Sequence, residues 1–479
     1  MSSSIRRGSR PWHALAVVML ASIAAIAQAA APRADDGEAG FRALYKELVE
    51  TNTTLSAGSC TVAAEKMAAR LQRAGMPAGA MQVLAPEDHP QSGSLVASYP
   101  GRNAKLKPIL LLAHIDVVEA RREDWERDPF TLVEEGGYFY ARGSSDDKAM
   151  AAIFTDLLVR WSEQGYRPQR GVTLALTCGE ETPANFNGVS WLLKAHPELL
   201  QAHFVVNEGA GGLLDADGKH LSLEVQAGEK VYQDFTLALA HPGGHSSRPT
   251  RENPIVRLSA ALTRVGAYQF PVALNEATRG YFTAQADLAS PDVAADMRAI
   301  VANPQDDAAA QRLWTANPSW NGMLRTTCVV TQITGGHANN ALPQRAAANV
   351  NCRILPGVPP EQVRDELVRV IADDKISVDM AGDRGLTSPA PALTTEIMQP
   401  IREIAHRMWP EARVVPTMST GGTDGRFLNA AGIPTYGVSG IFADAAGSGA
   451  HGLNERVRVQ SLLEGRHFLQ ELVTSYTRR

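Results

Sequence analysis

Cysteine is scarce in this sequence, and so are long apolar stretches. Four cysteines in 479 residues are too few for a scaffold held together by disulfides. Beyond the first 30 residues, no apolar run approaches the roughly 20 residues that a membrane-spanning helix needs. The basic residues are scattered and the formal net charge is −5, so no basic stripe is present for nucleic acid. These absences exclude three classes of protein, whereas 44% hydrophobic and 20% charged residues are ordinary for a globular enzyme.

The first 29 residues have the composition of a signal peptide. Three arginines (Arg6, Arg7 and Arg10) precede an apolar run over residues 14–27, and the tripeptide AQA at 27–29 has the small-x-small pattern that signal peptidase cuts. The alternative is an uncleaved membrane anchor, but the run is short for a span and no stop-transfer flank follows it. We therefore expect a periplasmic or secreted protein without a stable membrane anchor.

Two of the cysteines fall on strand-like segments. Cys328 lies in LRTTCVVTQI and Cys352 lies in AAANVNCRIL. Export would permit a disulfide between them. Two buried free thiols explain the pattern equally well, so both alternatives stay open.

The order of apolar patterns predicts two domains. Up to residue 228, continuous apolar strands alternate with helices, which is typical of an α/β sheet covered on both faces. The pattern changes after Gly228 to alternating strands and two helices, and the α/β pattern resumes near Thr394. We predict a catalytic α/β domain formed by residues 30–228 and 381–479, interrupted by an α+β domain at 229–380.

Acidic and histidine residues occur where apolar strands end. His114 ends KPILLLAHID, Glu180 and Glu181 end GVTLALTCGEE, and Glu208 ends AHFVVNEG. Ligands bind beyond the carboxyl ends of strands in an open α/β sheet. Each residue alone is a weak signal, but three strands that end in metal-ligand types indicate a metal site. Asp116 shares a strand face with His114, so its carboxylate is placed to accept the other ring N–H of that histidine.

An ordered set of segments carries a family resemblance. The segments are LLLAHIDVV, YARGSSDDKA, CGEET, NEG, GGHSSRP, NALP with NCRILPG, STGGTDGR and GAHGLNE. Over about residues 38–479 the sequence resembles the dizinc aminoacylase/carboxypeptidase family, which includes glutamate carboxypeptidase, succinyl-diaminopimelate desuccinylase, acetylornithine deacetylase and Gly-X carboxypeptidase. The resemblance implies a zinc-exopeptidase catalytic domain with a mixed central sheet flanked by helices. It also implies an inserted α+β lid or dimerisation domain.

The resemblance assigns a role to each candidate ligand. It implies two Zn²⁺ ions per chain, for which Co²⁺ or Mn²⁺ could substitute, and a cis peptide between Asp146 and Asp147. One ion would be held by His114 and Glu208, the other by Glu181 and His451, and both by Asp146. Glu180 would be the general base, and Asp116 would assist His114.

The resemblance also assigns substrate contacts. His245 in GGHSSRP would stabilise the oxyanion, in its own site or a partner's, although a Gly-rich turn with an incidental histidine is the alternative. Arg353 would bind the substrate carboxylate with Asn340 beside it, and Gly422 and Thr423 would offer backbone N–H groups. Five aromatic residues either line an acyl pocket or form the core of the insert: Phe270, Tyr281, Phe282, Trp314 and Trp320.

These residues predict hydrolysis of an amide bond next to a free carboxylate. The substrate would be a small peptide or an N-acyl amino acid. A carboxypeptidase or dipeptidase is favoured, and an N-acyl-amino-acid deacylase is the alternative. A non-catalytic periplasmic binding protein would have lost Glu180 or a ligand, and neither is lost here. The family's lid often pairs two chains, so the resemblance also implies a homodimer.

Overall fold

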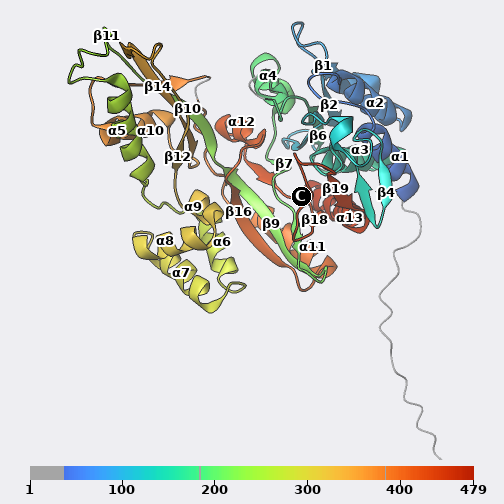
Figure 1. Ribbon diagram of the computed structural model, residues 1–479. Coiled ribbons are helices and arrows are strands. Elements are labelled where there is room, and N and C mark those ends of the chain that lie inside the picture. The colour runs from blue at the N-terminus through green and yellow to red at the C-terminus, as the bar shows by residue number, and fades with distance from the viewer. Residues whose placement is uncertain (1–36, 183–184, 383–384, 479) are drawn as a thin grey trace, which may run out of the picture.

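The protein consists of two lobes joined by long strands (Figure 1). The computed structural model describes residues 37–182, 185–382 and 385–478. The expected signal peptide, residues 1–29, lies outside the described residues. In the part of the chain that is described, no helix is both long enough and apolar enough to cross a bilayer.

The larger lobe is built on a mixed sheet of ten strands. In spatial order they are β1 (Met81–Leu84), β2 (Ser94–Tyr99), β6 (Val172–Thr177), β3 (Ile109–His114), β7 (Val205–Asn207), β17 (Thr435–Gly437), β9 (His220–Glu229), β8 (Gly212–Leu214) and β18 (Phe442–Ala443), with β16 (Arg413–Ser419) beside β9. β3 runs parallel to both β6 and β7, whereas β2 is antiparallel to β6. The expected mixed central sheet is confirmed.

Helices cover both faces of this sheet. One face packs on α1 (Glu38–Val49), α2 (Cys60–Arg73), α3 (Lys148–Glu163), α11 (Thr395–Met408) and α13 (Val459–Thr477), and the other on α4 (Gly188–Ala195) and α12 (Gly425–Ala430). In β3, Leu111 and Ala113 enter the first core, and Leu110 and Leu112 enter the second. Burial on both faces explains why this strand is apolar throughout.

Short elements complete the larger lobe. They are η1 (Ala78–Ala80), η2 (Arg122–Asp124), η3 (Pro197–Leu200) and a small sheet of β4 (Val133–Glu135), β5 (Tyr138–Tyr140) and β19 (Arg456–Arg458). A disulfide joins Cys60, at the start of α2, to Cys178, directly after β6. These two cysteines lie 118 residues apart, and no local pattern indicates that they pair.

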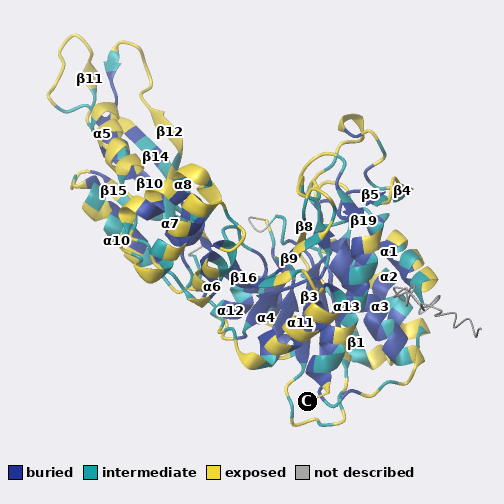
Figure 2. Cartoon of the chain, turned by 90° about the horizontal axis from the view of Figure 1, so that it is seen from below, coloured by how far each residue is buried: buried dark blue, intermediate teal, exposed yellow. Residues whose placement is uncertain are grey.

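The smaller lobe, called the lid below, contains a four-stranded antiparallel sheet. Its elements are β12 (Thr327–Gly335), β14 (Arg345–Ile354), β10 (Val231–Ala240) and β15 (Ser377–Ala381) in spatial order, with α5 (Pro254–Ala267) and α10 (Pro360–Ile371). Phe235 and Leu237 of β10 pack with Leu258 of α5 and Leu367 of α10. Cys328 and Cys352 form a disulfide between β12 and β14, which settles the alternative left open above. A two-stranded ribbon, β11 (Gly244–His245) with β13 (Ala341–Leu342), forms the tip of the lid (Figures 1 and 2).

Four helices lie between the lid sheet and the larger lobe. They are α6 (Glu276–Gln285), α7 (Pro291–Ala302), α8 (Asp307–Ala316) and α9 (Pro318–Leu324). Phe282 and Leu324 share their core with Met418 of β16, so this segment packs against the catalytic sheet. Phe282 is fully buried, and Tyr281 accepts a hydrogen bond from Trp320 at 3.3 Å. Phe282, Tyr281 and Trp320 therefore belong to this core, and Phe270 packs against the core of the lid sheet.

Candidate active site

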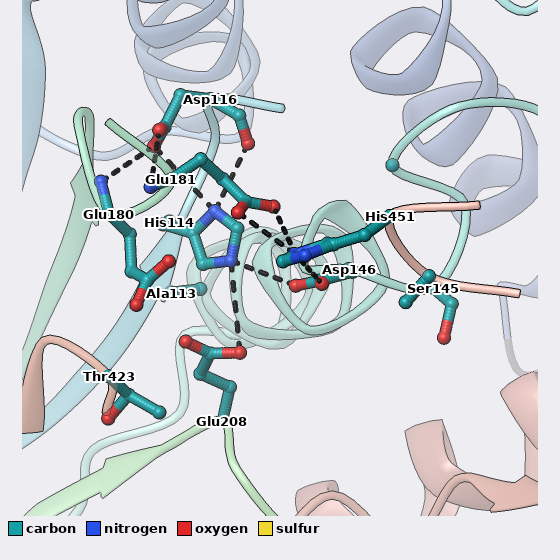
Figure 3. Close-up of polar contacts among 12 residues, drawn as sticks. Ala113, His114, Asp116, Ser145, Asp146, Glu180, Glu181, Glu208, Thr423 and His451 are labelled. Atoms are coloured by element: carbon teal, nitrogen blue, oxygen red, sulfur yellow. Dashed lines mark hydrogen bonds and ion pairs between the residues drawn. The ribbon is translucent and has the colours of Figure 1, made fainter. Parts of the chain in front are cut away.

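The strand ends meet at one edge of the central sheet, as the sequence predicts. His114 is the last residue of β3, and Glu180 and Glu181 follow the neighbouring strand β6. Glu208 directly follows β7 on the other side of β3. Figure 3 shows these four side chains around Asp146 and His451.

Asp146 lies between two groups of potential metal ligands. Its Oδ1 is 3.0 Å from Nε2 of His114, and its Oδ2 is 3.2 Å from Nε2 of His451. The His114 Nε2 is also 3.8 Å from Oε2 of Glu208, while the His451 Nε2 is 2.9 Å from Oε2 of Glu181. Each carboxylate oxygen of Asp146 thus faces one of the two ligand groups, which is the arrangement that a bridging ligand requires.

The donor set fits two divalent cations. The ligand atoms of His114, Asp146 and Glu181 all lie within 4.8 Å of one another. Hydrogen bonding to Asp146 and the charge of Glu181 raise the pKa of His451 to about 9, and burial raises the pKa of Glu181 to about 7. The crowded carboxylates therefore require positive charge, and imidazole nitrogens with carboxylate oxygens suit Zn²⁺, Co²⁺ or Mn²⁺.

The loop that carries Asp146 is fixed by residues that the sequence did not indicate. The peptide between Asp146 and Asp147 is cis, as the resemblance implies. The buried Glu455 carboxylate accepts hydrogen bonds from the backbone N–H groups of Ser145 at 2.8 Å and Asp146 at 3.0 Å, and from Arg142 at 2.7 Å. Glu455 is the last residue of the segment GAHGLNE, in which only His451 was assigned a role above. Its place in that segment is the sequence feature that could have indicated its importance.

Asp116 contacts His114 and also holds the neighbouring turn. Nδ1 of His114 is 3.1 Å from the backbone carbonyl oxygen of Asp116 and 3.6 Å from its carboxylate. The carboxylate also accepts hydrogen bonds from the backbone N–H groups of Glu180 at 3.3 Å and Glu181 at 3.0 Å. Because the chain turns after β6, its backbone donors lie closer to this carboxylate than the imidazole does. Asp116 therefore holds the Glu180–Glu181 turn, and its carbonyl orients His114.

Glu180 is placed to transfer a proton. Gly179 before it has a φ of 90°, and a Cβ there would lie 2.3 Å from the carbonyl oxygen of Phe186, so the turn requires glycine. The turn directs two consecutive glutamates into the same site (Figure 3). Burial, with a smaller effect of the Asp424 and Glu181 carboxylates, raises the pKa of Glu180 to about 8. A carboxyl group with a pKa near neutrality can both take up and release a proton.

The loop at Gly422 and Thr423 is largely engaged in internal hydrogen bonds. The backbone N–H of Thr423 donates to the buried Glu229 carboxylate, and its Oγ1 accepts from Asn207 at 3.1 Å. The Thr423 N–H is therefore not free for substrate, contrary to the nest we expected, whereas no described acceptor occupies the N–H of Gly422. Asp424 accepts a hydrogen bond from Asn187 at 2.6 Å, so it stabilises the loop.

Three cationic side chains gather where the two lobes meet. Arg353 of β14 stacks 4.9 Å from the ring centre of Tyr232. Burial, with a smaller effect of the Arg353 charge, lowers the pKa of Lys230 to about 7. A Cβ on Gly422 would lie 2.8 Å from a guanidinium nitrogen of Arg426. Neither arginine forms an ion pair with a carboxylate in the described part of the chain. Arg353 was predicted from the sequence as a substrate contact, whereas Arg426 and Lys230 were not identified. Arg426 is the last residue of the segment STGGTDGR, which was the available signal.

The structure does not bring His245 and Asn340 to the metal ligands. His245 is exposed in β11, and its Nδ1 accepts a hydrogen bond from the Ser247 N–H at 3.1 Å. The Ser246 N–H donates to the Asn340 carbonyl at 3.0 Å, so both residues lie at the tip of the lid. Figure 1 shows this tip at the end of the lid away from β7 and β18.

Comparisons with known proteins agree with the fold. Residues 110–475 match peptidase family M20/M25/M40. The chain is 29% identical over 381 residues to the human N-fatty-acyl-amino acid synthase/hydrolase PM20D1, covering 78% of this chain and 75% of that protein. It is also 29% identical over 340 residues to the probable carboxypeptidase S-like 2 of Dictyostelium discoideum, covering 70% of this chain and 64% of the relative.

A solved structure shares the whole fold. The M20 family metallo-carboxypeptidase Sso-CP2 of Sulfolobus solfataricus superposes with a TM-score of 0.66 at 19% identity, covering 91% of this chain and 99% of that one. The match to the family extends over most of the described residues and includes all five candidate metal ligands and Glu180. The protein therefore belongs to peptidase family M20/M25/M40, whose members are metal-dependent peptidases and amidohydrolases.

Proposed function

We propose that the protein hydrolyses an amide bond adjacent to a free carboxylate, with two Zn²⁺ ions bridged by Asp146. The observation that carries this proposal is the position of Asp146, with one oxygen toward His114 and the other toward His451. The ions, when bound, would polarise the amide carbonyl and lower the pKa of a water molecule. The mixed imidazole and carboxylate ligands would hold Zn²⁺, and Co²⁺ or Mn²⁺ could substitute for it.

The side chains around the ligands supply the remaining steps. Glu180 accepts a proton from the water that attacks the amide carbon. When the C–N bond breaks, it returns this proton to the nitrogen of the leaving amine, so the Glu180 carboxylate is regenerated. Asp116 fixes the turn that carries Glu180 through two backbone hydrogen bonds. Glu455 fixes the loop that carries Asp146.

The cations at the junction of the lobes support recognition of a carboxylate. Arg353 belongs to the lid, whereas Arg426 belongs to the larger lobe. A guanidinium group binds a carboxylate with two parallel hydrogen bonds. Neither arginine has an ion-pair partner among the described residues. A substrate carboxylate between them would supply that negative charge.

Two substrate classes share such a carboxylate. A carboxypeptidase or dipeptidase cleaves a peptide bond, which the name of the Dictyostelium relative favours. An N-acyl-amino-acid deacylase cleaves an acyl amide, which the name of the human relative favours. Dipeptides, N-acyl amino acids and the carboxamide form of each, assayed with zinc, separate these functions. We expect the carboxylate forms to be cleaved and the carboxamides to be poor substrates, and equal cleavage of both forms would disprove the carboxylate requirement.

We further propose that the lid pairs two chains. β12 is an edge strand of the lid sheet, and its Val329 and Ile333 are 60% and 56% exposed. An exposed apolar edge strand tends to be covered by another chain. Such pairing would allow His245 and Asn340 to reach the site of the partner chain. Light scattering that shows a monomer at assay concentration would contradict this pairing.

We also propose that residues 1–29 direct export and are then removed. The two disulfides support this because disulfides persist in oxidising compartments. N-terminal sequencing of the mature protein should find a chain that begins directly after Ala29. A mature chain that retains Met1 would contradict the proposal.

A further inference from the structure

A cavity of about 330 Å³ lies next to the metal ligands. Asp146 and Glu208 form its near end, and it extends between β8, β9 and β18 toward Tyr138 and Arg456. Its volume is at the lower end of the range of about 300–1,000 Å³ that small-molecule sites occupy. The walls combine apolar side chains, such as Phe442, with a few polar groups.

The cavity lies on the opposite side of the metal ligands from the arginine cluster. Ser145, which lines the cavity, lies beyond Asp146 and His451 in Figure 3. Thr423, beside the loop that adjoins Arg426, lies beyond Glu180 and Glu208 in the other direction. A substrate whose carboxylate is held by the arginines would therefore extend its acyl group into the cavity.

Most charged groups along the cavity already have partners. Asp444 accepts from Nε of Arg458 at 2.5 Å and from the hydroxyl of Tyr138 at 2.7 Å. Arg456 lies over the ring of the same tyrosine, at 4.8 Å from its centre. One aspartate and two arginines leave this far end of the cavity with one excess positive charge.

Glu224 is the exception. It lies in the middle of β9, where its neighbours Leu223 and Val225 point into the core, so its side chain projects from the opposite face. No donor in the described part of the chain bonds to its carboxylate, and burial raises its pKa to about 7. Glu224 is only partly exposed and lines the cavity, so a bound cation would offset the cost of holding an unpaired carboxylate there.

We propose that this cavity binds the acyl side of the substrate and that Glu224 forms an ion pair there with a protonated amine. The preferred substrate is then an aminoacyl compound with a free ammonium group, such as a dipeptide, and not an N-fatty-acyl amino acid. This inference rests on the proposed function, because it assumes that the amide bond that is cleaved lies between Glu224 on one side and Arg353 and Arg426 on the other.

Matched substrates test the inference directly. Glycyl-, β-alanyl- and 4-aminobutyryl-phenylalanine differ from propionyl-, butyryl- and pentanoyl-phenylalanine mainly by an ammonium group in place of a terminal methyl group. The wild-type enzyme should cleave at least one amine-bearing substrate with a kcat/KM about 10–100-fold above that of its neutral counterpart, as expected for a hydrogen bond to a charged group. Glu224→Gln, which keeps the shape of the side chain, should remove that preference. Glu198→Gln, an exposed glutamate in η3, is the matched control and should keep it.

The outcomes separate the inference from the function on which it rests. If the neutral substrates are cleaved as well as the amines, or if Glu224→Gln slows both members of a pair equally, the inference is wrong and the proposed function stands. If no member of any pair is cleaved by the zinc-loaded enzyme, the proposed function itself fails, and the inference fails with it.

Discussion

His114 and His245 show how differently the two lobes present functional residues. His114 ends a buried strand, its side chain is 1% exposed, and it contacts Asp146 and Asp116 within its own lobe. His245 stands in a two-residue strand at the tip of the lid, and its side chain is hydrogen-bonded to the neighbouring Ser247. The metal ligands are thus preassembled by the fold, whereas the lid residues require a movement or a second chain to reach a substrate. The predictions below test this contrast.

Removal of the bridging carboxylate should have the largest effect. Asp146→Ala removes a ligand from both metal positions, so we expect loss of both ions and no measurable hydrolysis. Glu181→Ala removes a ligand from one position only and should retain about one ion per chain. Elemental analysis of both purified variants measures this difference. Equal metal loss in the two variants would show that Asp146 does not bridge.

Removal of the base should separate chemistry from metal binding. Glu180→Gln keeps the size of the side chain but cannot accept a proton, so kcat should fall about 10²–10⁴-fold. Because Glu180 contacts neither imidazole, metal content should remain that of the wild type. A variant with near wild-type kcat would place the base elsewhere.

The exposed lid histidine should matter for turnover and not for metal. His245→Ala should lower kcat about 10²–10³-fold, as loss of an oxyanion donor does, with metal content unchanged. His241→Ala, four residues earlier in the same lid, is the matched control and should have little effect. If His245 acts on the partner's site, mixed dimers of the His245→Ala and Glu180→Gln chains should regain activity that neither variant has alone. If His245→Ala keeps the wild-type kcat, His245 is only an incidental residue of a Gly-rich turn.

The junction arginines should affect binding more than turnover. Arg353→Lys keeps the charge but loses the planar fork, so we expect KM for carboxylate substrates to rise about 10-fold with a smaller change in kcat. Arg426→Lys should act in the same direction if both arginines bind the carboxylate. Kinetics with carboxylate and carboxamide substrates measure the effect, and a KM change of equal size for both would contradict it.

The two disulfides should have the smallest effects on activity and unequal effects on stability. Cys60–Cys178 closes a segment of 118 residues and Cys328–Cys352 one of 24. In the chain-entropy description the longer loop stabilises more, by about 1 kcal/mol. Paired Cys→Ser variants compared by denaturant unfolding measure this. If removal of Cys328–Cys352 lowers the free energy of unfolding more than removal of Cys60–Cys178, the chain-entropy description does not hold for this protein.

The sequence predicts the parts of the site that depend on local pattern. These side chains lie at or just after the ends of apolar strands, so their convergence follows from the geometry of a parallel sheet. They are His114, Glu180, Glu181 and Glu208. The identity of the bridging residue came from the family resemblance alone.

The remaining contacts depend on residues far apart in the chain. Glu455 lies about 310 positions from the Asp146 loop that it holds, and Cys60 meets Cys178 only through the packing of α2. The carboxylate of Asp116 faces the Glu180–Glu181 turn because the chain bends after Gly179, which strand periodicity does not reveal. The distance of His245 from the metal ligands depends on the orientation of the lid, and no local pattern encodes that orientation.

Titration of metal-free protein with Zn²⁺, with hydrolysis of a dipeptide followed in parallel, tests the central claim most directly. We predict that activity is absent without metal, that two ions bind per chain, and that full activity requires both. Undiminished hydrolysis after exhaustive chelation, or saturation of activity at a single ion per chain, would contradict a two-metal site bridged by Asp146.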